Sequence, residues 1–154
     1  MPTSEELTVD RLSPNDMQPM KALLSVFSEA FDDPESYRHA PPSESYLKER
    51  LGSDEFIALV ARADNQIVGG LAAYELKKFE QERSEIYIYD LAVAAPYRRR
   101  GIATALIDRL RHIASARGAY VLFVQADLGD EPAIALYTKL GLREDVLHFD
   151  IQVG

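Results

Sequence analysis

Hydrophobic and polar residues follow strand-like periods in several short stretches of the chain. Alternation predicts a short, half-buried strand over residues 7–12, and apolar runs predict strands over residues 56–61 and 67–74. Asp64–Asn65 lies between the last two and is a typical turn pair, so these strands should form an antiparallel hairpin. A further run predicts a strand over residues 85–93.

Helical spacing of apolar residues predicts about four helices in all. The first begins at residues 13–16 and stops at residues 32–34; its expected inward-facing residues are Met20, Leu23, Leu24, Phe27 and Phe31. A proline-containing loop over residues 34–42 should follow. The second helix begins at Ser43 and stops at Gly52, and its expected inward-facing residues are Tyr46, Leu47 and Leu51.

The third predicted helix runs to about Arg117, where Gly118 is a typical residue to end a helix. Its expected inward-facing residues are Ile102, Leu106, Ile107, Leu110, Ile113 and Ala114. Residues 120–124 form a continuous apolar run, as expected of a central strand. The fourth helix begins near Pro132 and is closed by Gly141, with Ala133, Leu136, Tyr137 and Leu140 on one face.

The order of the elements predicts an α/β (α+β) fold with a mixed central sheet. Residues 142–153 should supply a last strand or hairpin, and the third helix should join two parallel strands. No repeat, linker or low-complexity segment interrupts the chain. We therefore expect a single domain over residues 1–154 that is large enough to bury a core.

The composition narrows the classes of function. There is no cysteine, so a disulfide, a thiol nucleophile and a Cys-based zinc site are excluded, and no His–carboxylate spacing indicates a metal ion. The formal net charge of -8 disfavours nucleic acid as a partner and suits a cationic substrate. No apolar run approaches the ~20 residues that span a membrane, and residues 1–6 lack a signal-like start. We expect a cytoplasmic protein that does not contact membranes.

One stretch carries the clearest chemistry. Residues 98–104 read Arg-Arg-Arg-Gly-Ile-Ala-Thr and join a predicted strand to a predicted helix. The first amides of a helix have no internal partner and carry partial positive charge, so an adjacent arginine cluster and a glycine favour a phosphate or pyrophosphate. The spacing fits neither a Walker A loop nor the dinucleotide-binding glycine fingerprint. The alternative is a solvated surface run of arginines.

The pattern Arg-x-x-Gly-x-Ala, formed by Arg98, Gly101 and Ala103, resembles the acetyl-coenzyme A motif of the GNAT N-acetyltransferases. A second segment, residues 133–142, resembles that family's Ala-x-x-Leu-Tyr-x-Lys-x-Gly-Phe segment, with Leu142 in place of the aromatic residue. The order and spacing of the two segments match the family. The resemblance implies a GNAT fold, whose mixed sheet contains a splayed parallel strand pair.

Three further segments, residues 79–93, 125–127 and 148–151, resemble the GNAT-type aminoglycoside 3-N-acetyltransferases, the type I gentamicin acetyltransferases. The resemblance covers most of the chain from Leu7. It implies transfer of acetyl from acetyl-coenzyme A to the 3-amino group of aminoglycosides, hence antibiotic resistance, and a homodimer. Two alternatives stay open: a GNAT enzyme for another polycationic amine, such as a polyamine or a protein amine, and a non-catalytic coenzyme A-binding module.

The resemblance also implies site residues. Residues expected to hold the thioester carbonyl, pantetheine arm and pyrophosphate are Leu91, Ala92, Val93, Arg98, Arg99, Arg100, Gly101, Ile102, Ala103 and Thr104. Tyr137 is expected to protonate the leaving thiolate; its alternative is a tyrosine packed in the core. Asp90, a carboxylate inside an apolar strand, is expected to act as a base or to anchor the cationic acceptor. Its alternative is a structural aspartate with satisfied partners.

An acidic and polar rim for the acceptor is expected from Glu85, Tyr89, Asp127, Asp130, Glu131, His148 and Asp150. For the carboxylates and for His148, an ordinary structural role is the stronger reading of the residues alone. Asp130 and Glu131, for example, suit a helix N-terminus.

Overall fold

The computed structural model describes residues 6–32 and 40–154, and the chain forms two compact units. The first unit spans residues 1–124 and the second spans residues 125–154. The described residues contain a five-stranded sheet and four α-helices, which confirms the predicted fold class. Most of the predicted loop over residues 34–42 lies outside the described residues.

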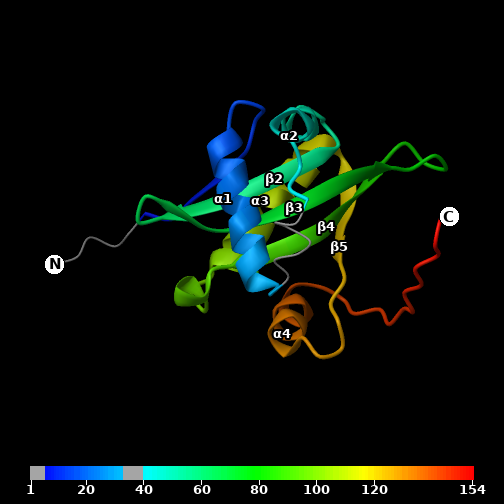
Figure 1. Cartoon of the computed structure of the whole chain (residues 1–154). Coiled ribbons are helices and arrows are strands. Elements are labelled where there is room, and N and C mark those ends of the chain that lie inside the picture. Colours follow the sequence, from blue (N-terminus) through cyan, green and yellow to red (C-terminus); the bar gives the residue numbers. More distant parts are fainter. Residues whose placement is uncertain (1–5, 33–39) are drawn as a thin grey trace. The chain divides into compact units, whose positions relative to one another are not determined.

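The sheet belongs to the first unit and has the strand order β1-β2-β3-β4-β5 (Figure 1). Neighbouring strands are antiparallel except β4 and β5, which are parallel, as predicted for strands joined by a helix. Asp64 and Asn65 both have positive φ, 55° and 59°, which is the turn geometry that tight hairpins prefer. The strands are β1 Thr8–Arg11, β2 Phe56–Ala63, β3 Gln66–Lys77, β4 Ser84–Val93 and β5 Ala119–Val124.

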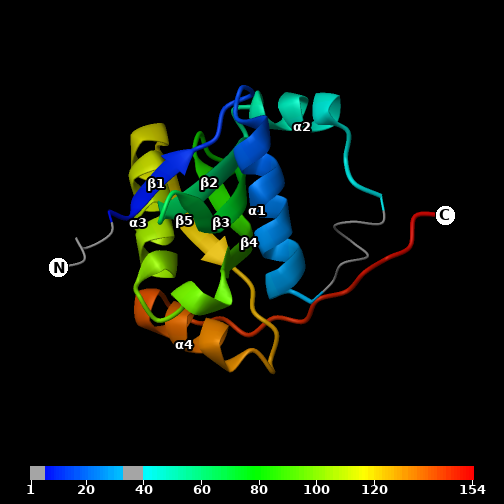
Figure 2. The same cartoon turned by 60° about the vertical axis from the view of Figure 1, so that its left-hand side comes forward.

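Different helices cover the two faces of the sheet. α1 (Met17–Ala30) and α2 (Glu44–Leu51) lie on one face and α3 (Ile102–Arg117) lies on the other, as Figure 2 shows. Because side chains alternate across a strand, residues of β2 divide between the two faces. The core under α1 and α2 consists of Leu12, Met20, Leu23, Phe27, Leu47, Leu51, Phe56, Ala58, Val60, Ala72 and Ala92.

Local chemistry explains where the helices begin and end. The Ser43 hydroxyl oxygen accepts a hydrogen bond from the Tyr46 amide at 3.2 Å and so caps α2. Gly118 ends α3 in the left-handed conformation, at φ 76°. In the second unit, Asp130 caps α4 (Glu131–Leu140) by accepting from the Ala133 amide at 3.3 Å. These boundaries confirm the sequence-based predictions within a few residues.

Four predictions are wrong in detail. Tyr46 and Phe31 are exposed (55% and 40%) rather than inward-facing. Phe31 lies beyond the end of α1 at Ala30, and Tyr46 is not on the side of α2 that buries Leu47 and Leu51. β5 is an edge strand and not a central strand, because β4 is its one neighbour in the sheet. Residues 142–153 form no strand or hairpin: they are exposed and pair with no strand among the described residues.

No helix among residues 6–32 and 40–154 combines the length and apolar character needed to cross a membrane.

Candidate functional site

The turn between β4 and α3 leaves the start of α3 uncapped. A short 3-10 helix, η2 (Ala95–Tyr97), follows β4, and the N-cap of α3 is Gly101 in the left-handed conformation at φ 79°. No side chain of the described residues caps this helix start. A Cβ placed on Gly101 would meet nothing within 4 Å, so the space beside the first amides of α3 is open.

The arginines beside this helix start are exposed, and their backbone is unusual. Arg98 Nε donates a hydrogen bond to the Val93 carbonyl oxygen at 3.0 Å, which ties the turn to the end of β4. Arg99 has a φ of 64°, a conformation that a residue with a side chain rarely adopts. Full positive charges therefore lie next to the positive end of a helix, and this combination fits a phosphate or pyrophosphate.

Tyr97 connects this turn to the β2–β3 hairpin, which the sequence did not predict. Its hydroxyl donates to Asp64 Oδ2 at 2.7 Å and accepts from Gln66 Nε2 at 2.8 Å. The guanidinium of Arg100 lies 5.2 Å from the centroid of the Tyr97 ring. These contacts tie the turn before α3 to the β2–β3 hairpin.

The second half of β4 has a free edge. The pairing of β4 with β5 ends at Ile88↔Val124, whereas β4 continues to Val93. The stretch Leu91–Val93 pairs with β3 on its other side. Within residues 6–32 and 40–154, no strand therefore pairs with this edge of Leu91–Val93, as predicted for a splayed parallel pair.

Asp90 lies directly before this open edge and follows a β-bulge. Ala73 pairs with Ile88 and Ala72 pairs with Asp90, so Tyr89 is the extra residue of β4. Ala72 belongs to the core under α1 and α2, and cross-strand partners share a face, so Asp90 points to that same face. The bulge thereby brings two consecutive residues, Tyr89 and Asp90, to one face of the sheet.

The Asp90 carboxylate is half-buried, and no hydrogen bond or ion pair to it occurs in the part of the chain that the structure describes. Burial raises the pKa of Asp90 above its ordinary value. A structural aspartate with satisfied partners does not match these surroundings. A carboxylate kept partly desolvated and unpaired is a candidate functional group.

A cluster of tyrosine rings lies near Asp90. Tyr89 contacts both Tyr74 and Tyr87 edge-on, with ring centroids 5.9 Å and 5.7 Å apart, and Tyr87 stacks on Phe123 of β5 at 4.6 Å. Burial raises the pKa of Tyr74 and of Tyr87, and the nearby charge of Asp90 adds to both shifts. We call Asp90, Tyr74, Tyr87 and Tyr89 the Asp90 surface. Of these residues the sequence had pointed to Asp90 and Tyr89; the β-bulge that unites them with Tyr74 and Tyr87 left no signal in the sequence.

Glu85 lies on the same strand, but its carboxylate already has two partners, Tyr120 and Lys78. The Tyr120 hydroxyl donates to Glu85 Oε1, and Lys78 Nζ lies 3.5 Å from the same oxygen. These contacts, the Tyr120 hydrogen bond first, lower the pKa of Glu85. Its predicted role in binding a cationic acceptor stays a prediction.

The remaining predicted residues lie in the second unit. Tyr137 is half-buried on α4, and burial, with a smaller contribution from the charge of Asp130, raises its pKa to about 12. Asp127, Asp130 and Glu131 are exposed before or at the start of α4. His148 Nε2 and Asp150 Oδ1 lie 2.8 Å apart on the exposed segment that follows α4.

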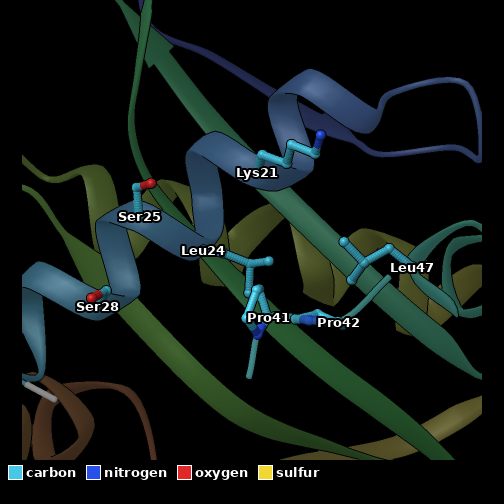
Figure 3. Close-up of a pocket in the computed structure, with 7 residues that line it drawn as sticks. All are labelled: Lys21, Leu24, Ser25, Ser28, Pro41, Pro42 and Leu47. Atoms are coloured by element: carbon cyan, nitrogen blue, oxygen red, sulfur yellow. The ribbon is translucent and has the colours of Figure 1, made fainter. Parts of the chain in front are cut away.

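A hollow of about 190 Å³ lies between α1 and the start of α2, and it contains none of the predicted site residues. Figure 3 shows Leu24 pointing toward Pro41 and Pro42, with Leu47 on the opposite wall. Because its lining is mostly apolar and Lys21 is its one charged group, the hollow offers no catalytic chemistry. Among residues 6–32 and 40–154, no cluster of histidines and carboxylates is suited to a metal ion.

Residues 20–142 match the model of the acetyltransferase (GNAT) family. An aminoglycoside acetyltransferase from an uncultured soil metagenomic sample, HMB0005, is 63% identical and superimposes with a TM-score of 0.95, covering 97% of this chain and 99% of that one. A second one from soil, meta-AAC0020, solved with sisomicin, is 31% identical with a TM-score of 0.89, covering 96% and 97%. The uncharacterized N-acetyltransferase YokL of Bacillus subtilis is 26% identical over 93% of this chain and 79% of its own length.

Proposed function

Because this chain belongs to the GNAT family of acetyltransferases, we propose that it transfers acetyl from acetyl-coenzyme A to the 3-amino group of an aminoglycoside. Acetyl-coenzyme A is the acetyl donor throughout the family. The likeness to HMB0005 and to the sisomicin complex of meta-AAC0020 supports the acceptor class. The 3-position, a role in antibiotic resistance, a cytoplasmic location and a homodimer are parts of the same proposal.

The donor would be held by backbone more than by side chains. The open amides of Ile102, Ala103 and Thr104, with the exposed arginines 98–100, fit the pyrophosphate. The free edge at Leu91, Ala92 and Val93 fits the pantetheine arm and the thioester carbonyl, because its amides and carbonyls have no strand partner. Acetyl-coenzyme A supplies the activated acetyl group, and the protein positions it.

The observation that carries the proposal is the Asp90 carboxylate at the end of this edge, which has no hydrogen-bond or ion-pair partner among the described residues. It adjoins the Leu91–Val93 segment and is partly desolvated by burial. In this setting an ionised carboxylate attracts a cationic amine and accepts a proton from it. A neutral amine is required for attack on the thioester, so Asp90 would serve as base, as anchor or as both.

Tyr137 would assist the leaving group. With a pKa of about 12, its phenol stays protonated over the working range of pH. A thiol has an ordinary pKa of about 8.5, so complete proton transfer from this phenol to the thiolate is unfavourable. Tyr137 would therefore stabilise the developing thiolate by donating a hydrogen bond rather than by giving up its proton.

The experiment is an acetyl-transfer assay that measures release of free coenzyme A thiol with three classes of acceptor: sisomicin, a polyamine and a peptide amine. The chain has no cysteine, so the protein adds no thiol background. We expect release with sisomicin at a kcat/KM far above that for the other acceptors, and NMR of the product should show acetylation at the 3-amino group. Preference for the polyamine or the peptide would reassign the acceptor. Binding of coenzyme A without release for any acceptor would indicate a non-catalytic module.

A further inference from the structure

The turn that leads into α3 does not fix its own conformation. In the part of the chain that the structure describes, no backbone amide of residues 99–104 donates a hydrogen bond, and the first bond of α3 runs from the Ala105 amide to the Gly101 carbonyl oxygen at 3.0 Å. Arg99 and Gly101 both have positive φ, 64° and 79°, a conformation that is strained for Arg99. Contacts from outside residues 99–104 therefore decide whether this turn keeps its shape.

Tyr97, which lies just before the turn, makes contacts of this kind on two sides. Its hydroxyl both donates and accepts: it donates to Asp64 Oδ2 at 2.7 Å and accepts from Gln66 Nε2 at 2.8 Å. Its ring centroid lies 5.2 Å from the guanidinium carbon of Arg100, within the range of a cation–π contact. A single side chain therefore links the β2–β3 hairpin to an arginine of the turn.

The sheet holds the chain that leads into this turn. The Val68 carbonyl oxygen accepts from the Ala94 amide at 2.7 Å, which continues the pairing of β3 with β4 past its last registered pair. Arg98 Nε donates to the Val93 carbonyl oxygen at 3.0 Å and so attaches the turn to the end of β4. Tyr97 adds the attachment to the hairpin, which is the one that depends on side chains from another part of the sequence.

We propose that Tyr97 is a positioning residue for the acetyl donor: with Asp64 and Gln66, it holds the open amides before α3 in the arrangement that binds the pyrophosphate. The inference rests on the proposed function, which identifies the anion. Amides that are held in place before the donor arrives bind it without a further cost of ordering the turn. Tyr97 acts through the turn and not on the thioester, so its loss should weaken donor binding and leave the chemical step unchanged.

The first test titrates coenzyme A into the protein by calorimetry and needs no acceptor. Tyr97→Phe keeps the ring and removes the hydroxyl, so the affinity should fall about tenfold. Tyr120→Phe is the matched control, because it removes a hydroxyl that also donates to a carboxylate, that of Glu85, and it should bind normally. Normal binding by Tyr97→Phe would overturn the role of Tyr97 alone. Failure of the unmodified protein to bind coenzyme A would overturn both this role and the proposed function.

The second test asks whether Tyr97 acts through Asp64. Asp64→Gly removes the carboxylate without straining its φ of 55°, and Asp64→Asn keeps an oxygen that accepts from the Tyr97 hydroxyl. We expect Asp64→Gly to weaken coenzyme A binding several-fold and Asp64→Asn to restore most of it. The double variant Asp64→Gly/Tyr97→Phe should bind about as well as Tyr97→Phe alone, because both changes break one link. Losses that multiply in the double variant would overturn the link.

The third test compares two donors in the acetyl-transfer assay with sisomicin. S-Acetylpantetheine carries the thioester but lacks the pyrophosphate and the nucleotide. With acetyl-coenzyme A, Tyr97→Phe should raise KM about tenfold and keep kcat; with S-acetylpantetheine it should match the unmodified protein. An equal loss with both donors would indicate a general structural defect and would overturn the positioning role. If the unmodified protein binds coenzyme A but transfers no acetyl, the proposed function fails, and the calorimetric titrations still decide the role of Tyr97.

Discussion

At the scale of one residue, Asp90 is the candidate catalytic group on β4. Its carboxylate is half-buried, unpaired in the described part of the chain, and has a raised pKa because of burial. Asp90→Asn should lower kcat/KM for sisomicin by about 10²–10⁴-fold if Asp90 is the base. Because a base acts only when ionised, kcat/KM of the unmodified enzyme should fall as pH drops through that raised pKa. The variant should lack this acid limb and recover some activity at high pH, where the amine deprotonates unaided.

The same substitution should stabilise the fold. A folded-state pKa above the unfolded value means that ionised Asp90 destabilises the folded protein at neutral pH, and that this cost vanishes once the group is protonated. Asp90→Asn should therefore raise Tm at pH 7 and change it little below the ordinary aspartate pKa. Asp10→Asn, at an exposed ion pair with Arg62, is the control for activity. A lower Tm at pH 7 with normal turnover would indicate that Asp90 has a structural role. A raised KM with normal kcat would indicate that Asp90 anchors the acceptor without acting as a base.

Tyr137 provides a second residue-scale prediction. Tyr137→Phe removes only the hydroxyl, so kcat should fall by about 100-fold while the affinity for acetyl-coenzyme A stays the same. Since its pKa is about 12, ionisation of Tyr137 should produce no alkaline limb in the kcat profile below pH ~10. Turnover equal to the unmodified enzyme would assign Tyr137 to packing alone.

At the scale of an element, the start of α3 should control donor binding. Gly101→Val forces a branched side chain into a φ of 79° and into the open space beside the first amides, so the affinity for acetyl-coenzyme A should fall by at least about tenfold in calorimetric titration. Gly118→Val is a matched control, because Gly118 has a φ of 76° at the other end of the same helix and also has open space around it. Both variants carry similar backbone strain. Equal loss of affinity in the two would show that strain, not blocking of the amides, is responsible.

A buried ion pair fixes the other end of α3 to the sheet. Glu75 is 8% exposed; it accepts hydrogen bonds from Ser84 Oγ at 2.6 Å and from Arg117 Nη1 at 2.8 Å, and Arg117 also donates to the Asp54 carbonyl. Burial by itself would raise the pKa of Glu75, but these hydrogen bonds outweigh it and lower the pKa. A carboxylate with a lowered pKa stabilises the fold above its unfolded pKa, and this stability is lost as pH falls through the folded value.

Arg117→Met should therefore lower the free energy of unfolding by about 3 kcal/mol at pH 7, because it leaves a buried charge without its partner. The loss should shrink as pH falls and Glu75 becomes protonated. Chemical denaturation at several pH values measures this. Arg111→Met on the same helix, whose ion pair with Asp108 is exposed, should cost less than about 0.5 kcal/mol. A pH-independent loss for Arg117→Met would indicate that packing, not the ion pair, stabilises this end of α3.

At the scale of the whole molecule, the net charge of -8 should attract a polycationic acceptor over a distance. Raising the ionic strength from ~0.05 M to ~0.5 M shortens the screening length, so KM for sisomicin should rise several-fold. kcat should change little, because the acceptor is already bound in the step that kcat reports. A kcat that falls in step with kcat/KM would place the effect of salt on the chemical step instead of on encounter.

The sequence by itself determined the parts of this protein that depend on neighbours along the chain. Helix starts at Ser43 and Asp130, the hairpin turn at Asp64–Asn65 and the glycine that ends α3 follow from local hydrogen bonds and backbone preferences. The arginine–glycine turn before α3 also depends only on residues that are neighbours along the chain. For this reason the order of the elements up to α4, the parallel pair and the position of the arginine–glycine turn could all be predicted.

Only the tertiary structure decided what depends on residues far apart in the sequence. The bulge that turns Tyr89 and Asp90 to one face depends on pairing with β3, and the hydrogen bonds of Tyr97 depend on the β2–β3 turn. An apolar run predicts that a strand is buried but does not predict which segment covers it. We therefore predicted paired strands for β5 and for residues 142–153, whereas among the described residues β5 pairs along one edge and residues 142–153 pair with no strand. Periodicity reports the preference of a segment, whereas pairing requires a second segment whose position is set by the whole fold.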